Sequence, residues 1–108
     1  MEINLEDGRP IVSDAMDNLK FALRIAKERK EKVVVIIHGY GSSGVGGAIC
    51  KSARQWLKAQ GRKGTLKRVV EGESFDMFNA DAREIKAKDT KVGKYYGQGN
   101  NGITVVEI

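Results

Sequence analysis

Cysteine and histidine are almost absent from this chain of 108 residues, which contains one of each. The single cysteine, Cys50, can form no disulfide within the chain, and this composition suits a reducing compartment. One cysteine and one histidine also cannot supply the ligands of a structural zinc site. The sequence therefore predicts no metal site and no cofactor.

The chain also lacks a long apolar run. No stretch approaches the roughly 18 apolar residues that a membrane-spanning helix needs. The first residues are acidic, unlike the basic and apolar start of a secretory signal. We therefore expect a soluble, cytoplasmic protein with no membrane partner. Hydrophobic residues make up 41% of the sequence, enough for one small core, so residues 1–108 are expected to form a single domain.

The positive charge is concentrated in one block of the sequence. The net charge is +5, yet residues 1–42 carry seven acids and seven bases. Residues 43–70 carry seven bases and no acid, whereas residues 71–108 carry seven acids and five bases. A concentrated excess of this kind is typical of a phosphate-binding surface, although a solvated helix face can have the same composition.

Apolar periodicity predicts alternating strands and helices. Strands are expected at residues 2–5, 33–37, 66–70 and 102–108. Helices are expected from about Ser13 to 32, with Ser13 or a neighbour as N-cap, from 45 to 60, and around Phe75, Phe78, Ala82 and Ile85. Residues 86–101 are polar and rich in glycine, and we expect them to form a mobile loop.

The run Val33–Ile37 is β-branched throughout and apolar on both faces, so it is expected deep in the sheet. The order strand–helix–strand–helix–strand–helix–strand predicts an α/β fold. The expected architecture is a two-layer sandwich with a mixed sheet of about four strands.

The helix predicted at residues 45–60 has two distinct faces. Lys51, Arg54 and Lys58 lie within about 60° of one another around the helix axis. The apolar residues lie on the opposite side, toward the sheet: Ile49, Ala53, Trp56 and Leu57. The helix therefore presents one face to the core and one cationic face to its surroundings.

The ten residues His38–Gly47, between a strand and a helix, include five glycines. Glycine lets the backbone turn sharply and lets a ligand approach the N–H groups closely. The helix start adds unpaired N–H donors and the positive end of the helix dipole. We expect this turn to bind an anion, although glycines would also serve a tight turn that binds nothing.

Three known motifs partly match this turn. Gly39-x-Gly41-x-x-Gly44 fits the dinucleotide-binding fingerprint, so a nucleotide or dinucleotide site at Gly39–Gly44 is an alternative. The acid expected about 20 residues later is missing, however. A Walker loop is excluded because no Gly-Lys-Ser/Thr follows. An α/β-hydrolase oxyanion loop is excluded because the chain has neither a Gly-x-Ser-x-Gly elbow nor a second histidine.

A fourth motif accounts for the whole chain. His38-Gly39-Tyr40-Gly41 follows an apolar strand and precedes a helix, and the chain ends in Gly-Asn-Asn-Gly-Ile-Thr-Val-Val-Glu-Ile at residues 99–108. Together these features resemble the Smr (small MutS-related) domain, and the resemblance extends from residue 2 to 108. It implies a domain that binds nucleic acid, since Smr domains do so and several are DNA or RNA endonucleases.

The first strand departs from the family pattern. The resemblance implies a Leu-Asp-x-His motif there, and the matching residues read Ile3-Asn4-Leu5-Glu6. Cleavage without a metal needs a general base and usually an acid. His38 is a candidate for one role, and Glu6 or Asp7 for the other if the fold brings them to the same sheet edge. The sequence thus favours nucleic-acid binding over endonuclease activity.

We expect contacts to the phosphate backbone of RNA or structured DNA, because no helix resembles a base-reading recognition helix. The predicted contacts come from His38, Gly39, Tyr40, Gly41, Ser42, Ser43, Gly44, Lys51, Arg54 and Lys58. Tyr95 and Tyr96 could stack on unpaired bases or cover the edge of the core. Glu71, Glu73 and Asp76 form an acidic group that is more typical of a solvated turn than of a metal site.

Overall fold

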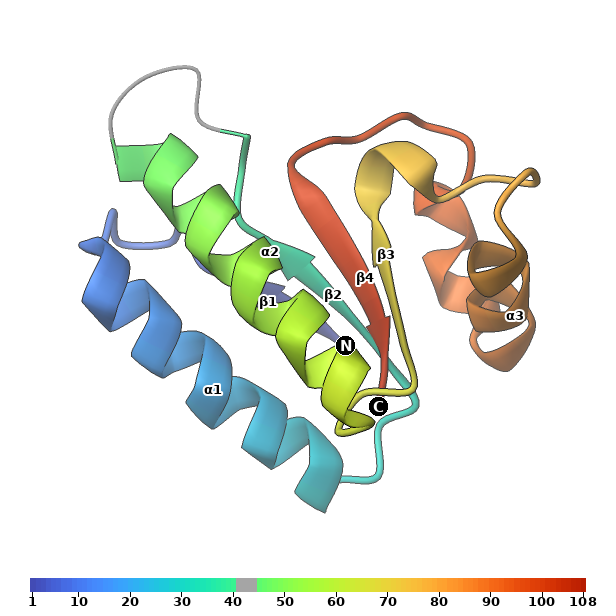
Figure 1. The fold of residues 1–108 in the computed structure, drawn as a ribbon, viewed down its shortest axis with the longest axis horizontal. Helices are drawn as coiled ribbons and strands as arrows, with labels where there is room; N and C mark the ends of the chain where they lie inside the picture. The colour runs from blue at the N-terminus through green and yellow to red at the C-terminus, as the bar shows by residue number, and fades with distance from the viewer. Residues whose placement is uncertain (41–44) are drawn as a thin grey trace.

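Four strands form one mixed sheet in the computed structural model, which describes residues 1–40 and 45–108 (Figure 1). The elements in chain order are β1 (Glu2–Asn4), α1 (Val12–Glu28), β2 (Val33–Ile37), α2 (Val45–Lys63), β3 (Arg68–Glu71), the 3₁₀ helix η1 (Gly72–Ser74), α3 (Ala80–Lys88), the 3₁₀ helix η2 (Thr90–Tyr95) and β4 (Ile103–Glu107). The predicted α/β class, with a mixed sheet of four strands, is confirmed.

The spatial order of the strands is β1-β2-β4-β3. β1 runs parallel to β2, with Ile3 opposite Ile36, and β4 runs antiparallel to both β2 and β3. The last strand of the chain therefore lies in the middle of the sheet, next to β2. This insertion brings the start of β4 to the turn that follows β2.

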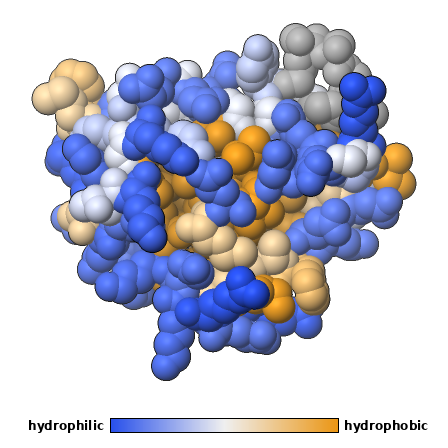
Figure 2. Space-filling model, turned by 180° about the vertical axis from the view of Figure 1, so that it is seen from behind, coloured by the Kyte–Doolittle hydropathy of each residue, from blue (hydrophilic) through white to orange (hydrophobic). Residues whose placement is uncertain are grey.

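Helical segments cover both faces of the sheet. α1 and α2 pack on the face that carries Val34, Ile36 and Val106. η1, α3 and η2 lie on the face that carries Val33 and Val105. Figure 2 shows this second face, where hydrophilic side chains surround apolar ones at the centre. The arrangement has three layers where two were expected, because a central strand that is apolar on both faces must be covered on both.

The helix boundaries differ from those predicted. Ile11, not Ser13, is the N-cap of α1, and no side chain of the described residues caps this helix. α2 continues past Gly61 to Lys63. Gly61 lies inside the helix, and a Cβ there would come within 3.2 Å of the Val69 side chain, so the glycine allows β3 to approach α2 closely. Gly64, at φ +80°, follows the end of α2, as glycine commonly does after a helix.

The segment 86–101, for which a loop is predicted, contains regular structure. Its first residues complete α3, and residues 90–95 form η2 with Val92 buried against the sheet. Phe75 is buried, but Phe78 is 87% exposed and precedes the start of α3. The predicted loop and the predicted apolar position at Phe78 are therefore corrected. The described part of the chain contains no helix long and apolar enough to cross a membrane.

Candidate nucleic-acid interface

His38 follows β2 directly and is completely buried, with 0% of its surface exposed. Its Nδ1 lies 2.5 Å from the carbonyl oxygen of Gly39, so Nδ1 carries the proton and donates it. Nε2 lies 2.9 Å from the hydroxyl of Thr104 in β4. The backbone N–H groups of His38 and Gly39 both donate to the carbonyl of Gly102. His38 thus joins the end of β2 to the start of β4.

The electrostatic surroundings keep this imidazole neutral. Burial lowers the pKa of His38, and the nearby positive charge of Arg54 lowers this pKa further, against the opposing effect of the hydrogen bond to Gly39. A neutral ring with a protonated Nδ1 accepts at Nε2 from the Thr104 hydroxyl. Both ring nitrogens are therefore engaged inside the protein.

Replacing His38 with alanine is expected to lower the free energy of unfolding by about 2–4 kcal/mol. The change leaves a cavity and removes the partner of the Thr104 hydroxyl and of the Gly39 carbonyl. Thermal unfolding measures the loss. An unchanged melting temperature combined with lost nucleic-acid binding would instead place His38 in direct contact with the ligand.

The same histidine predicts a pH dependence of stability. Its pKa is lowered in the folded protein, whereas unfolded histidine titrates near 6.5. Below about pH 6.5 the unfolded chain binds more protons at this histidine than the folded protein does. The contribution of neutral His38 to the free energy of unfolding is therefore complete above about pH 6.5, and it is lost as the pH falls toward the folded-state pKa. The free energy of unfolding, measured by denaturant titration at several pH values, should fall less steeply with decreasing pH in His38→Asn, which lacks this titration, than in the parent.

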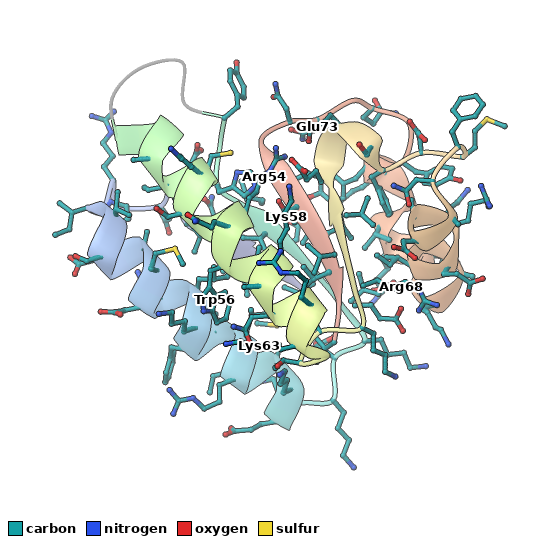
Figure 3. The ribbon with its side chains drawn as sticks, viewed as in Figure 1. Arg54, Trp56, Lys58, Lys63, Arg68 and Glu73 are labelled. Carbon is teal, nitrogen blue, oxygen red and sulfur yellow. The ribbon has the colours of Figure 1, made fainter. Side chains whose placement is uncertain are left out.

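Arg54 projects from α2 into a cluster of acceptors and is only 14% exposed. Its guanidinium makes ion pairs of 2.8 Å with Glu71 and 2.7 Å with Glu73. It also donates to the hydroxyl of Thr104 and to the carbonyls of Asn101 and Ile103. All five of its N–H donors are used. Figure 3 shows Arg54 and Glu73 facing each other from α2 and η1.

These contacts connect Arg54 to His38 through one hydroxyl. Arg54 Nε donates to Thr104 Oγ1 at 3.2 Å, and this hydroxyl is the partner of His38 Nε2. The chain of hydrogen bonds ends at the carbonyl of Gly39. Arg54 therefore holds the start of β4 and the turn after β2 in place, and a phosphate would have to compete with its existing partners.

The fold neutralises part of the basic block found in the sequence. Lys58 pairs with Glu71 at 2.6 Å, and Arg68 pairs with Glu107 at 2.5 Å. Among the described residues, the members of this block that make no ion pair are Lys51, Arg62, Lys63 and Lys67. The cationic face predicted from Lys51, Arg54 and Lys58 thus keeps one unpaired base. Glu71 and Glu73, for which a solvated turn was expected, serve as partners of these bases.

Glu6 lies at the same sheet edge as His38 and Gly39. Gly39 has φ +69°, and its bare Cα faces the carboxylate of Glu6 so closely that a Cβ would overlap Oε1. An Asx turn holds Glu6 there, since its N–H donates to Asn4 Oδ1 at 2.9 Å. Asp7 is exposed, and no hydrogen bond within residues 1–40 and 45–108 joins it to this edge. Nothing in the sequence pattern predicts the contact between Glu6 and Gly39.

The other predicted site residues are dispersed. Tyr40 is 62% exposed beside Gly39, and Gly41, Ser42, Ser43 and Gly44 lie outside the described residues. Tyr95 and Tyr96 pack on the sheet face opposite α2, where Tyr95 donates to Glu2 and Tyr96 contacts Phe75 edge-on. The structure therefore brings together Glu6, His38 and Gly39 but places the two tyrosines elsewhere.

The class of this protein is defined by an α/β fold in which the central strand β2 ends at a buried histidine, His38, which is linked through Thr104 to Arg54. Residues 11–76, more than half of the chain, match the Smr domain family, to which this chain belongs. The match includes the His38 turn and α2, while β1 and β4 lie outside it. Smr domains are generally nucleic-acid-binding, nuclease-like domains. No curated protein and no solved structure matches the chain significantly.

Proposed function

We propose that this Smr domain binds RNA or structured DNA by contacting the phosphate backbone from α2 and from the turn after β2. The observation that carries the proposal is the set of bases on and just after α2 that the acids of the described residues leave unpaired. Lys51 and Arg62, 11 residues apart, lie within about 20° of each other around the helix. Two cations about 16 Å apart on one side of a helix can contact separate, non-adjacent phosphates of one nucleic acid.

The hydrogen bonds of Arg54 and His38 support this function indirectly. Through Thr104 they fix the backbone around Gly39, beside which Tyr40 is exposed. Backbone that is already held by hydrogen bonds, as at His38 and Gly39, loses little conformational entropy when it receives a phosphate. In this proposal, Arg54 and His38 position the site, while Lys51, Arg62 and the turn contact the ligand.

The salt dependence of binding tests the proposal. Replacing Lys51 and Arg62 with glutamine should flatten the plot of log affinity against log salt by about 0.9 for each phosphate of duplex nucleic acid that is no longer neutralised. The affinities for supercoiled DNA, duplex DNA and hairpin RNA should all fall. Lys88→Gln with Lys91→Gln removes two exposed charges from the other face of the sheet and serves as the control.

Equal slopes for the two double variants would contradict backbone binding along α2. A shallow slope combined with competition by a mononucleotide would instead favour the nucleotide or dinucleotide site at Gly39–Gly44.

Phosphodiester cleavage is a second candidate function, favoured by the position of Glu6. Its exposed carboxylate lies against Gly39, whereas His38, the other candidate, is buried with both ring nitrogens engaged. Glu6 is therefore the stronger candidate for a general base at this edge. A carboxylate beside the turn also repels phosphate, which predicts a slow reaction.

A further inference from the structure

A hollow of about 310 Å³ lies between α1 and α2, away from the turn after β2. Leu23 and Leu66 form its apolar floor, and Trp56 lines it from α2. Figure 3 shows Trp56 between the two helices. The volume is at the lower end of the range for small-ligand sites, roughly 300–1,000 Å³, and suits one planar group rather than several.

Trp56 is only partly buried in this hollow. The ammonium of Lys20 lies over the indole ring, 5.7 Å from the ring centroid. That distance is close to the outer limit of a cation–π contact. Because Lys20 is an exposed, flexible side chain, it can move aside and leave the ring face available for stacking.

Among the described residues, three bases border the hollow and no acid does. Lys20, Arg24 and Lys27 line it from successive turns of α1. None of the three makes an ion pair within the part of the chain that the structure describes. Arg54 and Arg68, by contrast, are held by carboxylates. An aromatic ring beside cations without carboxylate partners is the combination that binds unpaired bases together with their phosphates.

We propose that this groove binds a single-stranded segment of nucleic acid, with one unpaired base stacked on Trp56 and the flanking phosphates on Lys20, Arg24 and Lys27. The proposal rests on the proposed nucleic-acid binding and specifies its substrate class. In a duplex, the bases are stacked on one another and cannot enter the groove. The domain therefore prefers loops, tails and branch points that expose a base.

Trp56 is the only tryptophan in the chain, so its fluorescence reports on the groove directly. Unlabelled oligouridylate or oligothymidylate should quench this fluorescence in a saturable way, because stacking places a base against the ring. A blunt duplex should leave the emission nearly unchanged, even when a separate anisotropy assay shows that the duplex is bound.

Two double variants locate the binding surface. Arg24→Gln with Lys27→Gln should lower the affinity for single strands, measured by quenching, at least threefold. It should also flatten the plot of log affinity against log salt by about 0.7 for each phosphate that is no longer neutralised. Lys88→Gln with Lys91→Gln should match the parent. In both double variants the two replaced bases are exposed, and one of the two lies in the last turn of a helix.

The outcomes separate this proposal from the function on which it rests. Single-strand binding without a change in Trp56 emission, or equal reductions in affinity for the two double variants, would overturn the groove proposal and leave nucleic-acid binding intact. Quenching by polyglutamate but not by oligonucleotides would overturn it too, and would assign the groove to an acidic peptide. Failure to bind any nucleic acid in the anisotropy assay would overturn both.

Discussion

Replacing Arg54 with glutamine is expected to lower the free energy of unfolding by about 2–4 kcal/mol, because one side chain holds together three separate parts of the chain. The change leaves the carboxylate of Glu73 and the carbonyl of Ile103 without their donor. It also breaks the link to Thr104 and His38. For a domain of this size the melting temperature should fall by roughly 10–25 °C.

Lys58→Gln is the matched control for Arg54→Gln. Lys58 pairs with Glu71 from the same helix, but its side chain is 49% exposed, so removing this ion pair should cost less than about 1 kcal/mol. Arg54→Lys keeps the charge but should recover little stability, because one ammonium cannot replace five donors in a planar fork. Equal melting temperatures for Arg54→Gln and Lys58→Gln would show that the cluster contributes little to stability.

The second large effect concerns phosphodiester cleavage. We expect the parent protein to bind nucleic acid but to cleave it slowly or not at all, because Asn4 stands where the family resemblance implies a carboxylate. An amide cannot accept a proton from an attacking water or hydroxyl, and general-base assistance is typically worth roughly 10²–10⁴ in rate. Asn4→Asp combined with Glu6→His should therefore raise the cleavage rate by a factor in that range, with little change in affinity.

The hydrogen bond that shapes the turn between residues 4 and 6 can be kept in this double variant. Asn4 Oδ1 accepts the N–H of Glu6, and an aspartate at position 4 can accept it in the same way. A histidine at position 6 would stand beside Gly39, where the carboxylate of Glu6 now lies.

Cleavage of a labelled hairpin RNA and of supercoiled DNA, each with and without magnesium, measures the effect. Rapid cleavage by the parent that is abolished in Glu6→Gln or Asp7→Asn would show that a carboxylate already serves as the base. In that case the domain is a nuclease without further change.

The sequence alone was sufficient to predict the structural features that depend only on neighbouring residues. The β-branched run Val33–Ile37 predicted a central strand, and the structure places it there with its first four residues buried. The apolar spacing in α1 predicted its buried face, which includes Leu19 and Leu23. Helical and strand periodicities are properties of a short segment, so they can be recognised without knowledge of the fold.

The sequence did not indicate which charges are neutralised. Arg54 and Glu73 are 19 positions apart and meet only because β3 and η1 return alongside α2. The helical periodicity of α2 placed Arg54 with Lys51 and Lys58 on one side of the helix. Periodicity could not show that Glu71 of β3 and Glu73 of η1 occupy that side.

By itself the sequence determined the α/β class, the positions of the strands and the excess of positive charge. The tertiary structure alone decided that His38 is buried, that Glu6 lies against Gly39 and that Trp56 borders a cationic groove. The physical reason is the range of the contacts. Strand and helix patterns repeat within a few residues, whereas each of these three environments depends on segments that meet only when β1 and β4 pair beside β2 or when α1 packs against α2.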